Sequence, residues 1–305
     1  MSDPKTLLQQ IRSGDTRALA RAITIVENEM EGSSELLKSL DLDKAAPIIG
    51  ITGPPGAGKS TLISSLISHL TTQGKKIAVI AVDPTSPFNF GSLLGDRLRM
   101  SEHFTNPNVF IRSIATRGSL GGLSAKTIEV SDVVRAAGFD LVILETVGVG
   151  QSEIEIAGLA DTTVLVLVPE SGDEVQALKS GIMEIADIYV VNKSDREGAN
   201  TFIKNLQALV HHREGSTWIP KILKTVATKN EGAEELYSGI LAHQKEAITN
   251  SRRTYLYSEK AWRLIQQARM KDLTRDQLQN QVAKEISEGK FQLYGFVEEF
   301  ISRKT

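Results

Sequence analysis

One stretch decides the fold of this chain: Gly53-Pro54-Pro55-Gly56-Ala57-Gly58-Lys59-Ser60-Thr61, which fits the pattern G-x-x-x-x-G-K-[ST]. An apolar run at residues 48–52 precedes it and is expected to form a buried strand. Residues 62–67 follow it with the spacing of a helix. Because the pattern stands between a strand and a helix, it predicts a loop that binds phosphate groups.

The residues of this loop have distinct physical roles. Gly53, Gly56 and Gly58 lack a Cβ atom, so the backbone can curl and point its N–H groups at phosphate oxygens. Lys59 is expected to bring positive charge to the β- and γ-phosphates, and Ser60 to place a hydroxyl on a bridging magnesium ion. A bare glycine-rich turn would have no use for this Lys-Ser pair. The whole stretch is a predicted nucleotide-binding element, which also includes Pro54, Pro55, Ala57 and Thr61.

The composition restricts the class of protein. The chain has 305 residues, of which 41% are hydrophobic and 24% charged, as in an ordinary globular protein with a sizeable core. Its net charge of -2 argues against non-specific binding of nucleic acid. The absence of Cys excludes disulfides and thiolate metal sites, and the five His residues show no metal-ligand spacing. Because no apolar run has the length of a membrane span or signal peptide, we expect a cytoplasmic protein without membrane partners.

From residue 45 onward, short apolar runs rich in β-branched residues alternate with amphipathic helical segments. This alternation predicts an α/β fold with a mostly parallel sheet flanked by helices, and with the phosphate-binding loop it predicts a P-loop NTPase domain. The expected strands are residues 48–52, 77–82, 109–113, 141–145, 164–168, 188–191 and 222–226. Ligands of such sheets bind beyond the carboxyl ends of the strands, where Asp83, Glu145 and Asn192 stand.

Helical extensions are expected on both sides of the P-loop domain. Residues 1–44 predict a helical extension that caps the domain, and Asp15 is a candidate N-cap within it. The domain itself is expected to cover residues 45–247. Residues 248–305 predict a helical arm with helices at 261–270, 276–286 and 291–301. The many aromatic residues of this arm suit either packing on the sheet or a subunit interface, and the sequence leaves both open.

Asn192-Lys193-Ser194-Asp195 follows an apolar strand and fits the N-K-x-D element that reads guanine in GTPases. The carboxylate of Asp195 would accept two hydrogen bonds from guanine, which adenine cannot offer, so adenine would leave a buried acceptor unpaired. Lys193 is expected to lie along the base, and Asn192 to tie this loop to the phosphate loop. A further candidate contact, to guanine O6, falls at Val226, Ala227 and Thr228. An ordinary strand end explains that last stretch equally well.

Glu145-Thr146-Val147-Gly148 resembles the D-x-x-G switch of GTPases, with Glu in place of Asp. Glu145 could hold magnesium directly or through water, and the amide of Gly148 could reach the γ-phosphate. In the Ras-like pattern a water-orienting Gln follows the glycine at once. Here Val149 takes that place and Gln151 is displaced. We therefore expect slow intrinsic hydrolysis that a partner accelerates.

A loop rich in Pro, Gly, Asn and Ser separates two further candidate carboxylates, Asp83 and Asp96, which could bind metal or position water. Several arginines could supply charge to the transition state, and the sequence does not rank them: Arg97, Arg99, Arg112 and Arg117. Residues 172–179 form a charged loop that either reports the nucleotide state to a partner or places acids at a helix N-terminus.

Taken together, these residues resemble the MeaB/ArgK-type P-loop GTPases, chaperones of adenosylcobalamin-dependent methylmalonyl-CoA mutase. The resemblance rests on residues 17–23, 53–61, 82–84, 91–97, 116–122, 145–153, 172–176, 186–187 and 192–195. It implies a Mg²⁺-dependent GTPase that binds GTP and GDP, forms a homodimer through its helical arm, gates cobalamin loading onto the mutase and protects that enzyme. It also implies magnesium and hydrolysis roles for Lys59, Ser60, Asp83, Asp96 and Glu145, and a partner-sensing switch at residues 172–179.

Alternative functions remain open from the sequence. Related GTPases that deliver nickel use His/Cys clusters, which this chain lacks. An ATPase or kinase of an amino-acid transport system of the LAO/AO type is a second possibility, which the N-K-S-D element disfavours. A nucleotide-regulated scaffold with incidental hydrolysis is a third.

Overall fold

A computed structural model describes residues 4–83, 100–115, 125–146, 152–171, 182–210, 218–246, 251–270 and 273–302. The chain divides into two compact units, Met1–Leu256 and Tyr257–Thr305. The first unit carries the sheet and both candidate loops, and the second is helical where it is described. Among the described residues, no helix combines the length and the apolar character that crossing a membrane requires.

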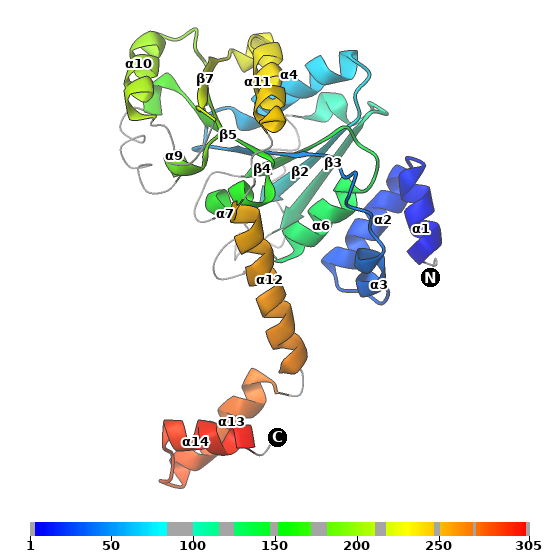
Figure 1. Ribbon diagram of the computed structural model, residues 1–305, viewed down its shortest axis with the longest axis vertical. Coiled ribbons are helices and arrows are strands. Elements are labelled where there is room, and N and C mark those ends of the chain that lie inside the picture. The colour runs from blue at the N-terminus through cyan, green and yellow to red at the C-terminus, as the bar shows by residue number, and fades with distance from the viewer. Residues whose placement is uncertain are drawn as a thin grey trace. The chain divides into compact units, whose positions relative to one another are not determined.

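The first unit is built on a seven-stranded sheet in the order β3-β2-β4-β1-β5-β6-β7 (Figure 1). Every neighbouring pair in this sheet is parallel. The strands are β1 (Ile48–Thr52), β2 (Ile77–Asp83), β3 (Val109–Ala115), β4 (Leu141–Thr146), β5 (Thr162–Leu167), β6 (Ile188–Val191) and β7 (Lys221–Lys224). The predicted α/β fold with a parallel sheet is therefore confirmed.

The last strand differs from its predicted extent of 222–226. It ends at Lys224 because Val226 leaves the sheet and forms an isolated antiparallel bridge with Glu231. Between these two residues lies the short 3-10 helix η3 (Ala227–Lys229). The predicted strand end at Val226 is thus a tight turn beside the sheet.

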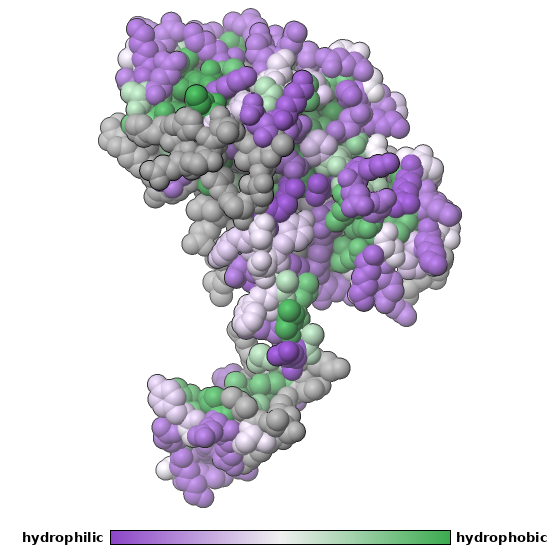
Figure 2. Space-filling model, in the orientation of Figure 1, coloured by the Kyte–Doolittle hydropathy of each residue, from purple (hydrophilic) through white to green (hydrophobic). Residues whose placement is uncertain are grey.

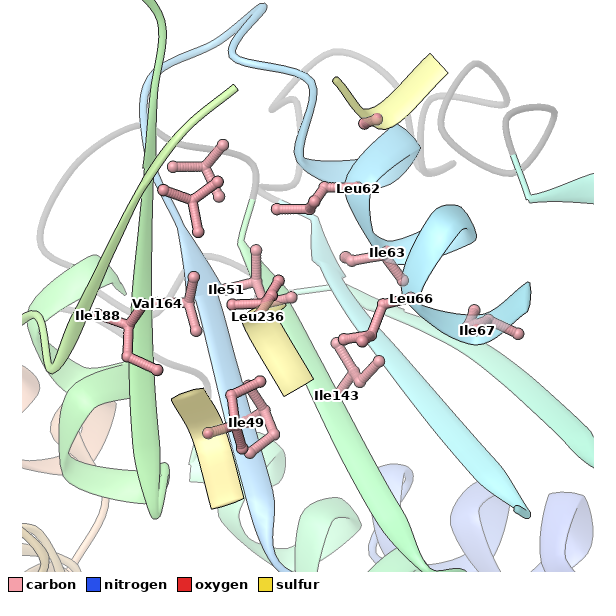
Figure 3. Close-up of a cluster of buried hydrophobic side chains, with 14 of the residues drawn as sticks. Ile49, Ile51, Leu62, Ile63, Leu66, Ile67, Ile143, Val164, Ile188 and Leu236 are labelled. Carbon is pink, nitrogen blue, oxygen red and sulfur yellow. The ribbon is translucent and has the colours of Figure 1, made fainter. Parts of the chain in front are cut away.

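Helices cover both faces of the sheet. The described ones after β1 are α4 (Lys59–Thr72), α6 (Ala125–Arg135), α7 (Ser152–Leu159), α9 (Ile182–Ile185), α10 (Ala199–Leu209) and α11 (Ala233–Lys245), with the 3-10 turns η1 (Ser101–His103) and η2 (Pro169–Ser171). Leu62 and Leu66 of α4 and Leu236 of α11 gather over Ile51 and Ile143 of the sheet (Figure 3). These side chains are buried, so this face holds the larger part of the apolar core.

On the opposite face of β1, a glycine determines how closely helix α7 can pack. Successive strand residues point to opposite faces, so Gly50 faces α7 while its neighbours Ile49 and Ile51 face the core beneath α4. A Cβ atom at Gly50 would lie 2.6 Å from Ile156 Cγ2 and 3.0 Å from Ala160 Cβ. Only glycine therefore lets α7 approach the strand this closely.

The N-terminal extension consists of α1 (Pro4–Arg12), α2 (Thr16–Glu27) and α3 (Ser33–Lys38), which pack together and against α6. Asp15 caps α2, as predicted, by accepting hydrogen bonds from the backbone N–H groups of Arg17 and Ala18 at 2.8 and 3.1 Å. Glu27 of α2 pairs with Arg112 of β3 at 3.1 Å. The extension is thus attached to the sheet by an ion pair as well as by apolar packing.

The C-terminal helices are α12 (Ser251–Arg269), α13 (Arg275–Ser287) and α14 (Leu293–Ser302). The predicted boundary of the first helix, residue 261, is wrong, since α12 begins at Ser251. The guanidinium of Arg253 in its first turn donates to Leu159 O at 2.8 Å and to Asp161 Oδ1 at 2.9 Å. These long-range contacts give the early turns of α12 a partner that local sequence does not reveal.

The described part of the second unit exposes much apolar surface (Figure 2). Trp262 is 58% exposed and Tyr294 is 79% exposed. Leu264, Ile265, Ile286, Leu293 and Val297 are exposed as well. Large apolar side chains in such numbers on a small helical unit are typical of a surface that binds another protein.

Candidate nucleotide-binding site

The phosphate-loop stretch occupies the turn between β1 and α4, and its backbone requires glycine. Gly53, Gly56 and Gly58 have φ values of +142°, +77° and +86°, which L side chains rarely adopt. A Cβ at Gly53 would lie 2.1 Å from Val166 O, and one at Gly58 would lie 2.4 Å from Asn192 Nδ2. The loop is therefore enclosed by β5 on one side and by the Asn192 loop on the other.

Helix α4 begins at Lys59, directly after this loop. Gly58, at the N-cap, has no side chain with which to cap the first turn, so that turn can offer its N–H groups and its dipole to an anion. The ammonium group of Lys59 is buried and donates to Gly53 O at 2.7 Å and to Pro54 O at 3.0 Å. It thus lies across the loop, within reach of a phosphate held there.

Ser60 and Glu145 come together beside the loop. The Ser60 hydroxyl donates to Glu145 Oε1 at 2.7 Å, and Glu145 is only 5% exposed. The register of the sheet causes this approach, because Glu145 of β4 lies opposite Ile51 of β1. A hydroxyl that gives its proton to a carboxylate keeps its own lone pairs for a cation, and Mg²⁺ prefers oxygen ligands. These two residues therefore fit a magnesium site.

Asn192 joins three loops. Its Nδ2 donates to Ala57 O in the phosphate loop at 2.9 Å, which is the link expected from the sequence. Its Oδ1 accepts hydrogen bonds from Thr225 Oγ1 at 3.1 Å and from the backbone N–H of Ala227 at 3.2 Å. The side chain is 2% exposed, so each of these bonds is made away from water. We call these three hydrogen bonds of Asn192, to Ala57, Thr225 and Ala227, the Asn192 clasp.

Lys193 and Asp195 lie at the surface beside the Asn192 clasp. Lys193 has a positive φ of 55°, and its Nζ donates to Gly56 O at 2.9 Å. Asp195 pairs with Lys229 at 3.2 Å, and 44% of its side chain is exposed. In this structure it is therefore not the buried acceptor that the sequence predicted. A carboxylate in this position can accept hydrogen bonds from a base that enters from solvent.

The three residues of the predicted contact to guanine O6, Val226, Ala227 and Thr228, lie in the turn after β7. Val226 donates its N–H to Glu231 O at 3.1 Å, whereas Ala227 donates to Asn192. Thr228 is exposed. Sequence reasoning missed Thr225, which is buried and bonds Asn192 through its hydroxyl. Its position directly before the predicted stretch, at the end of an apolar run, was the available signal.

Sequence reasoning also missed a contact between the loop after β6, which carries the N-K-S-D element, and the turn after β5. Arg196 pairs with Glu170 of η2, and this guanidinium holds the pKa of the Glu170 carboxyl below its ordinary value of 4.5. Both side chains are about half exposed. The chain enters the charged loop at residues 172–179 directly after η2.

Several candidate residues fall outside the described residues: Asp96, Gly148, Gln151, Arg97, Arg99, Arg117 and the loop 172–179. Asp83 ends β2, although its side chain is not among those described. Arg112 is engaged by Glu27 of the N-terminal extension. The structure thus brings together the phosphate loop, Ser60, Glu145 and the N-K-S-D element.

Comparisons with known proteins agree with this geometry. The family model described as "Methylmalonyl Co-A mutase-associated GTPase MeaB" matches residues 19–287. A putative GTPase of Pyrococcus horikoshii is 51% identical over 244 residues, which are 78% of this chain and 77% of that protein. The GTPase ArgK of Escherichia coli is 38% identical over 257 residues, which are 81% and 77% of the two chains.

This chain also resembles one further relative in sequence and one solved structure. The mouse protein named "Methylmalonic aciduria type A homolog, mitochondrial" is 36% identical over 280 residues, which are 83% of this chain and 67% of that protein. A crystal structure titled as a LAO/AO transport system kinase superposes with a TM-score of 0.68 at 25% identity. It covers 98% of this chain and 97% of its own.

Proposed function

Because the chain belongs to the family of methylmalonyl Co-A mutase-associated GTPases, we propose that it is the chaperone of an adenosylcobalamin-dependent acyl-CoA mutase. Family membership makes it a GTP hydrolase that binds GTP and GDP. In the proposed role, GTP binding and hydrolysis gate cofactor loading onto the mutase and protect that enzyme. The family description supports a mutase partner.

Guanine selection is assigned to Asp195, with Lys193 along the base and the turn at Val226, Ala227 and Thr228 near its O6. The observation that carries this assignment is the Asn192 clasp, which fixes the N-K-S-D loop against the phosphate loop through Ala57. A base held beside Asp195 would therefore have a fixed distance to phosphates held at Lys59. Rigid placement of this kind is what lets one carboxylate discriminate between guanine and adenine.

Magnesium binding is assigned to Ser60 and Glu145, together with Asp83 and Asp96. The hydrogen bond of 2.7 Å between Ser60 and Glu145 supports the first two. When bound, the ion would supply positive charge that offsets the negative charge developing on the phosphates. Lys59 would add its ammonium charge, and the amide of Gly148 would contact the γ-phosphate.

The homodimer is assigned to the helical arm, residues 248–305, while residues 1–44 and 45–247 form the extension and the GTPase domain. The exposed Trp262 and Tyr294 support this assignment, since both are residue types that interfaces favour. The partner-sensing role is assigned to residues 172–179, directly after the Glu170–Arg196 ion pair.

The first experiment compares kcat/KM for GTP and ATP in the wild type, in Asp195→Ala and in a control, Asp43→Ala, whose carboxylate is exposed and lies in the N-terminal extension. We expect the wild type to prefer GTP by at least about 100-fold and Asp195→Ala to lose that preference. An unchanged preference in Asp195→Ala would contradict the assignment of guanine reading.

The same assay with an adenosylcobalamin-dependent acyl-CoA mutase tests the chaperone role. Turnover of GTP should rise when the mutase is added, because the intrinsic rate is expected to be slow. The similarity to a structure titled as a transport system kinase favours a second candidate, an ATPase or kinase of an amino-acid transport system. Equal use of ATP and GTP, with no effect of the mutase, would support that candidate instead.

A further inference from the structure

Helix α4 carries two serines four positions apart, Ser60 and Ser64, which lie on the same side of the helix. Ser60 bonds Glu145 of β4, as described above. Ser64 bonds a different segment, the 3-10 turn η1, through Glu102 and His103. One face of the phosphate-loop helix therefore holds both the end of β4 and the chain that precedes β3.

The geometry at Ser64 assigns the donors and acceptors. The Ser64 hydroxyl donates to Glu102 Oε1, so its oxygen is left to accept. His103 Nε2 lies 2.9 Å from Ser64 Oγ, 3.2 Å from Ser64 O and 3.4 Å from Glu102 Oε1. All three atoms are acceptors toward the imidazole, so Nε2 carries the proton.

The cluster is anchored in the core. His103 is 6% exposed and lies against α4, while Met100, three residues earlier, is 1% exposed within the core beneath that helix. Glu102 closes the cluster from outside with 65% of its side chain exposed. The turn from Met100 to His103 is thus fixed on α4 by one apolar and two polar attachments.

This turn is where the chain continues after residues 84–99, which contain Asp96. We propose that Ser64, Glu102 and His103 are positioning residues for GTP hydrolysis, because they fasten the chain that follows Asp96 to the helix that carries Lys59 and Ser60. This inference rests on the proposed hydrolysis role of Asp96 and is independent of the mutase partner. In this proposal the cluster affects the turnover of GTP and leaves the affinity for GDP unchanged.

The cluster and the proposed contacts to GDP involve different residues, so their effects can be measured separately. GDP binding depends on the phosphate loop and the Asn192 clasp, neither of which contacts η1 through a hydrogen bond among the described residues. Loss of the cluster should therefore lower kcat for GTP and leave the affinity for GDP unchanged. A purely structural role would instead lower both, together with the melting temperature.

The variants are Ser64→Ala, His103→Phe and Glu102→Ala, each assayed for GTP turnover by the protein alone and for binding of a fluorescent GDP analogue. We expect kcat to fall about tenfold, which corresponds to loss of one buried hydrogen bond network. His103→Gln can still donate to Ser64 and should retain most of the rate. Glu102→Ala alters an exposed side chain, so it tests the proposal even where the buried variants do not fold.

The chain offers a matched control in Ser65→Ala. Ser65 is the next residue of α4, is 3% exposed, and its hydroxyl has no hydrogen-bond partner among the described residues. Its kcat should equal that of the wild type. A normal kcat in Ser64→Ala and Glu102→Ala, or an equal loss in Ser65→Ala, would overturn the positioning role alone. A wild type without GTP turnover would overturn the function itself.

Discussion

Asn192 and Ala57 lie 135 positions apart in the sequence, and a hydrogen bond of 2.9 Å joins the side chain of the first to the carbonyl of the second. This bond connects the loop proposed to read the base with the loop proposed to hold the phosphates. Since Asn192 also bonds Thr225 and Ala227, one buried amide sets the distance between the two ends of a bound nucleotide.

Replacement of this amide should weaken binding of GTP and GDP alike. Asn192→Ala leaves the Thr225 hydroxyl and the Ala227 N–H without their acceptor, which costs about 2–3 kcal/mol and predicts affinities roughly 30- to 150-fold lower. Isothermal titration calorimetry with each nucleotide measures the change. Asn200→Ala is the control, because Asn200 is exposed and bonds Lys224 only at the surface. Wild-type affinity in Asn192→Ala would contradict the role of the Asn192 clasp in nucleotide binding.

Neutralisation of Glu145 should affect the magnesium dependence of hydrolysis more than nucleotide binding. Glu145→Gln keeps an oxygen that can accept from Ser60, but it removes the negative charge. We expect the magnesium concentration for half-maximal GTP turnover to rise about tenfold or more. Steady-state assays across magnesium concentrations check this, with Glu234→Gln, an exposed residue of α11, as the control. An unaltered magnesium dependence would remove Glu145 from the metal site.

Removal of Arg253 should destabilise the first unit. Its guanidinium holds Leu159 O and Asp161, and Asp161 in turn accepts the N–H of Ile48 at 2.7 Å, at the start of β1. Because this pair is only about a quarter exposed, we expect Arg253→Ala to lose about 1–2 kcal/mol of unfolding free energy. Urea denaturation measures the loss, and Arg263→Ala, an exposed residue of the same helix, should be neutral. Equal stability of the two variants would show that the contacts of Arg253 do not stabilise the first unit.

The stability of the sheet should depend on pH through Asp140. The backbone N–H of Lys76 and the ammonium of Lys75 hold the pKa of the Asp140 carboxyl below its ordinary value of 3.8. A carboxyl whose folded pKa is lowered stabilises the protein above its unfolded pKa, and this stabilisation is lost as the pH falls through the folded pKa.

Asp140→Ala should therefore destabilise the protein at neutral pH, whereas the difference from the wild type should vanish well below pH 3.8. The side chain is 42% exposed, so we expect less than about 1 kcal/mol. Chemical denaturation of both proteins at several pH values gives this difference, and Asp43→Ala serves as the exposed control. A difference that grows toward acid pH would contradict the sign of the effect.

The strands and the phosphate loop could be predicted because their signals are local. Buried parallel strands need continuous β-branched runs, such as residues 48–52, and Gly53, Gly56 and Gly58 need positive φ whatever surrounds them. The expected link from Asn192 to the phosphate loop followed from the N-K-x-D element, which is also a local pattern.

The remaining contacts depend on residues far apart in the sequence. The early start of α12 is set by Arg253 and Asp161, 92 positions apart, and the cluster at Ser64 joins α4 to Glu102. No local pattern distinguishes Ser64 from Ser65, although only the first has a partner among the described residues. The roles of all the candidate site residues, Asp83, Asp96 and Gly148 among them, stay predictions.

β1 lies between β4 and β5, which come much later in the sequence. During synthesis from the N-terminus, the ribosome must add residues through Leu167 before β1 has both neighbours, and through Asn192 before the phosphate loop is clasped. Until then β1 lacks at least one of these partners, and pairing over such separations is slow. The strand that carries the phosphate loop is the first strand to be made, yet its second neighbour exists only after more than a hundred further residues have been added.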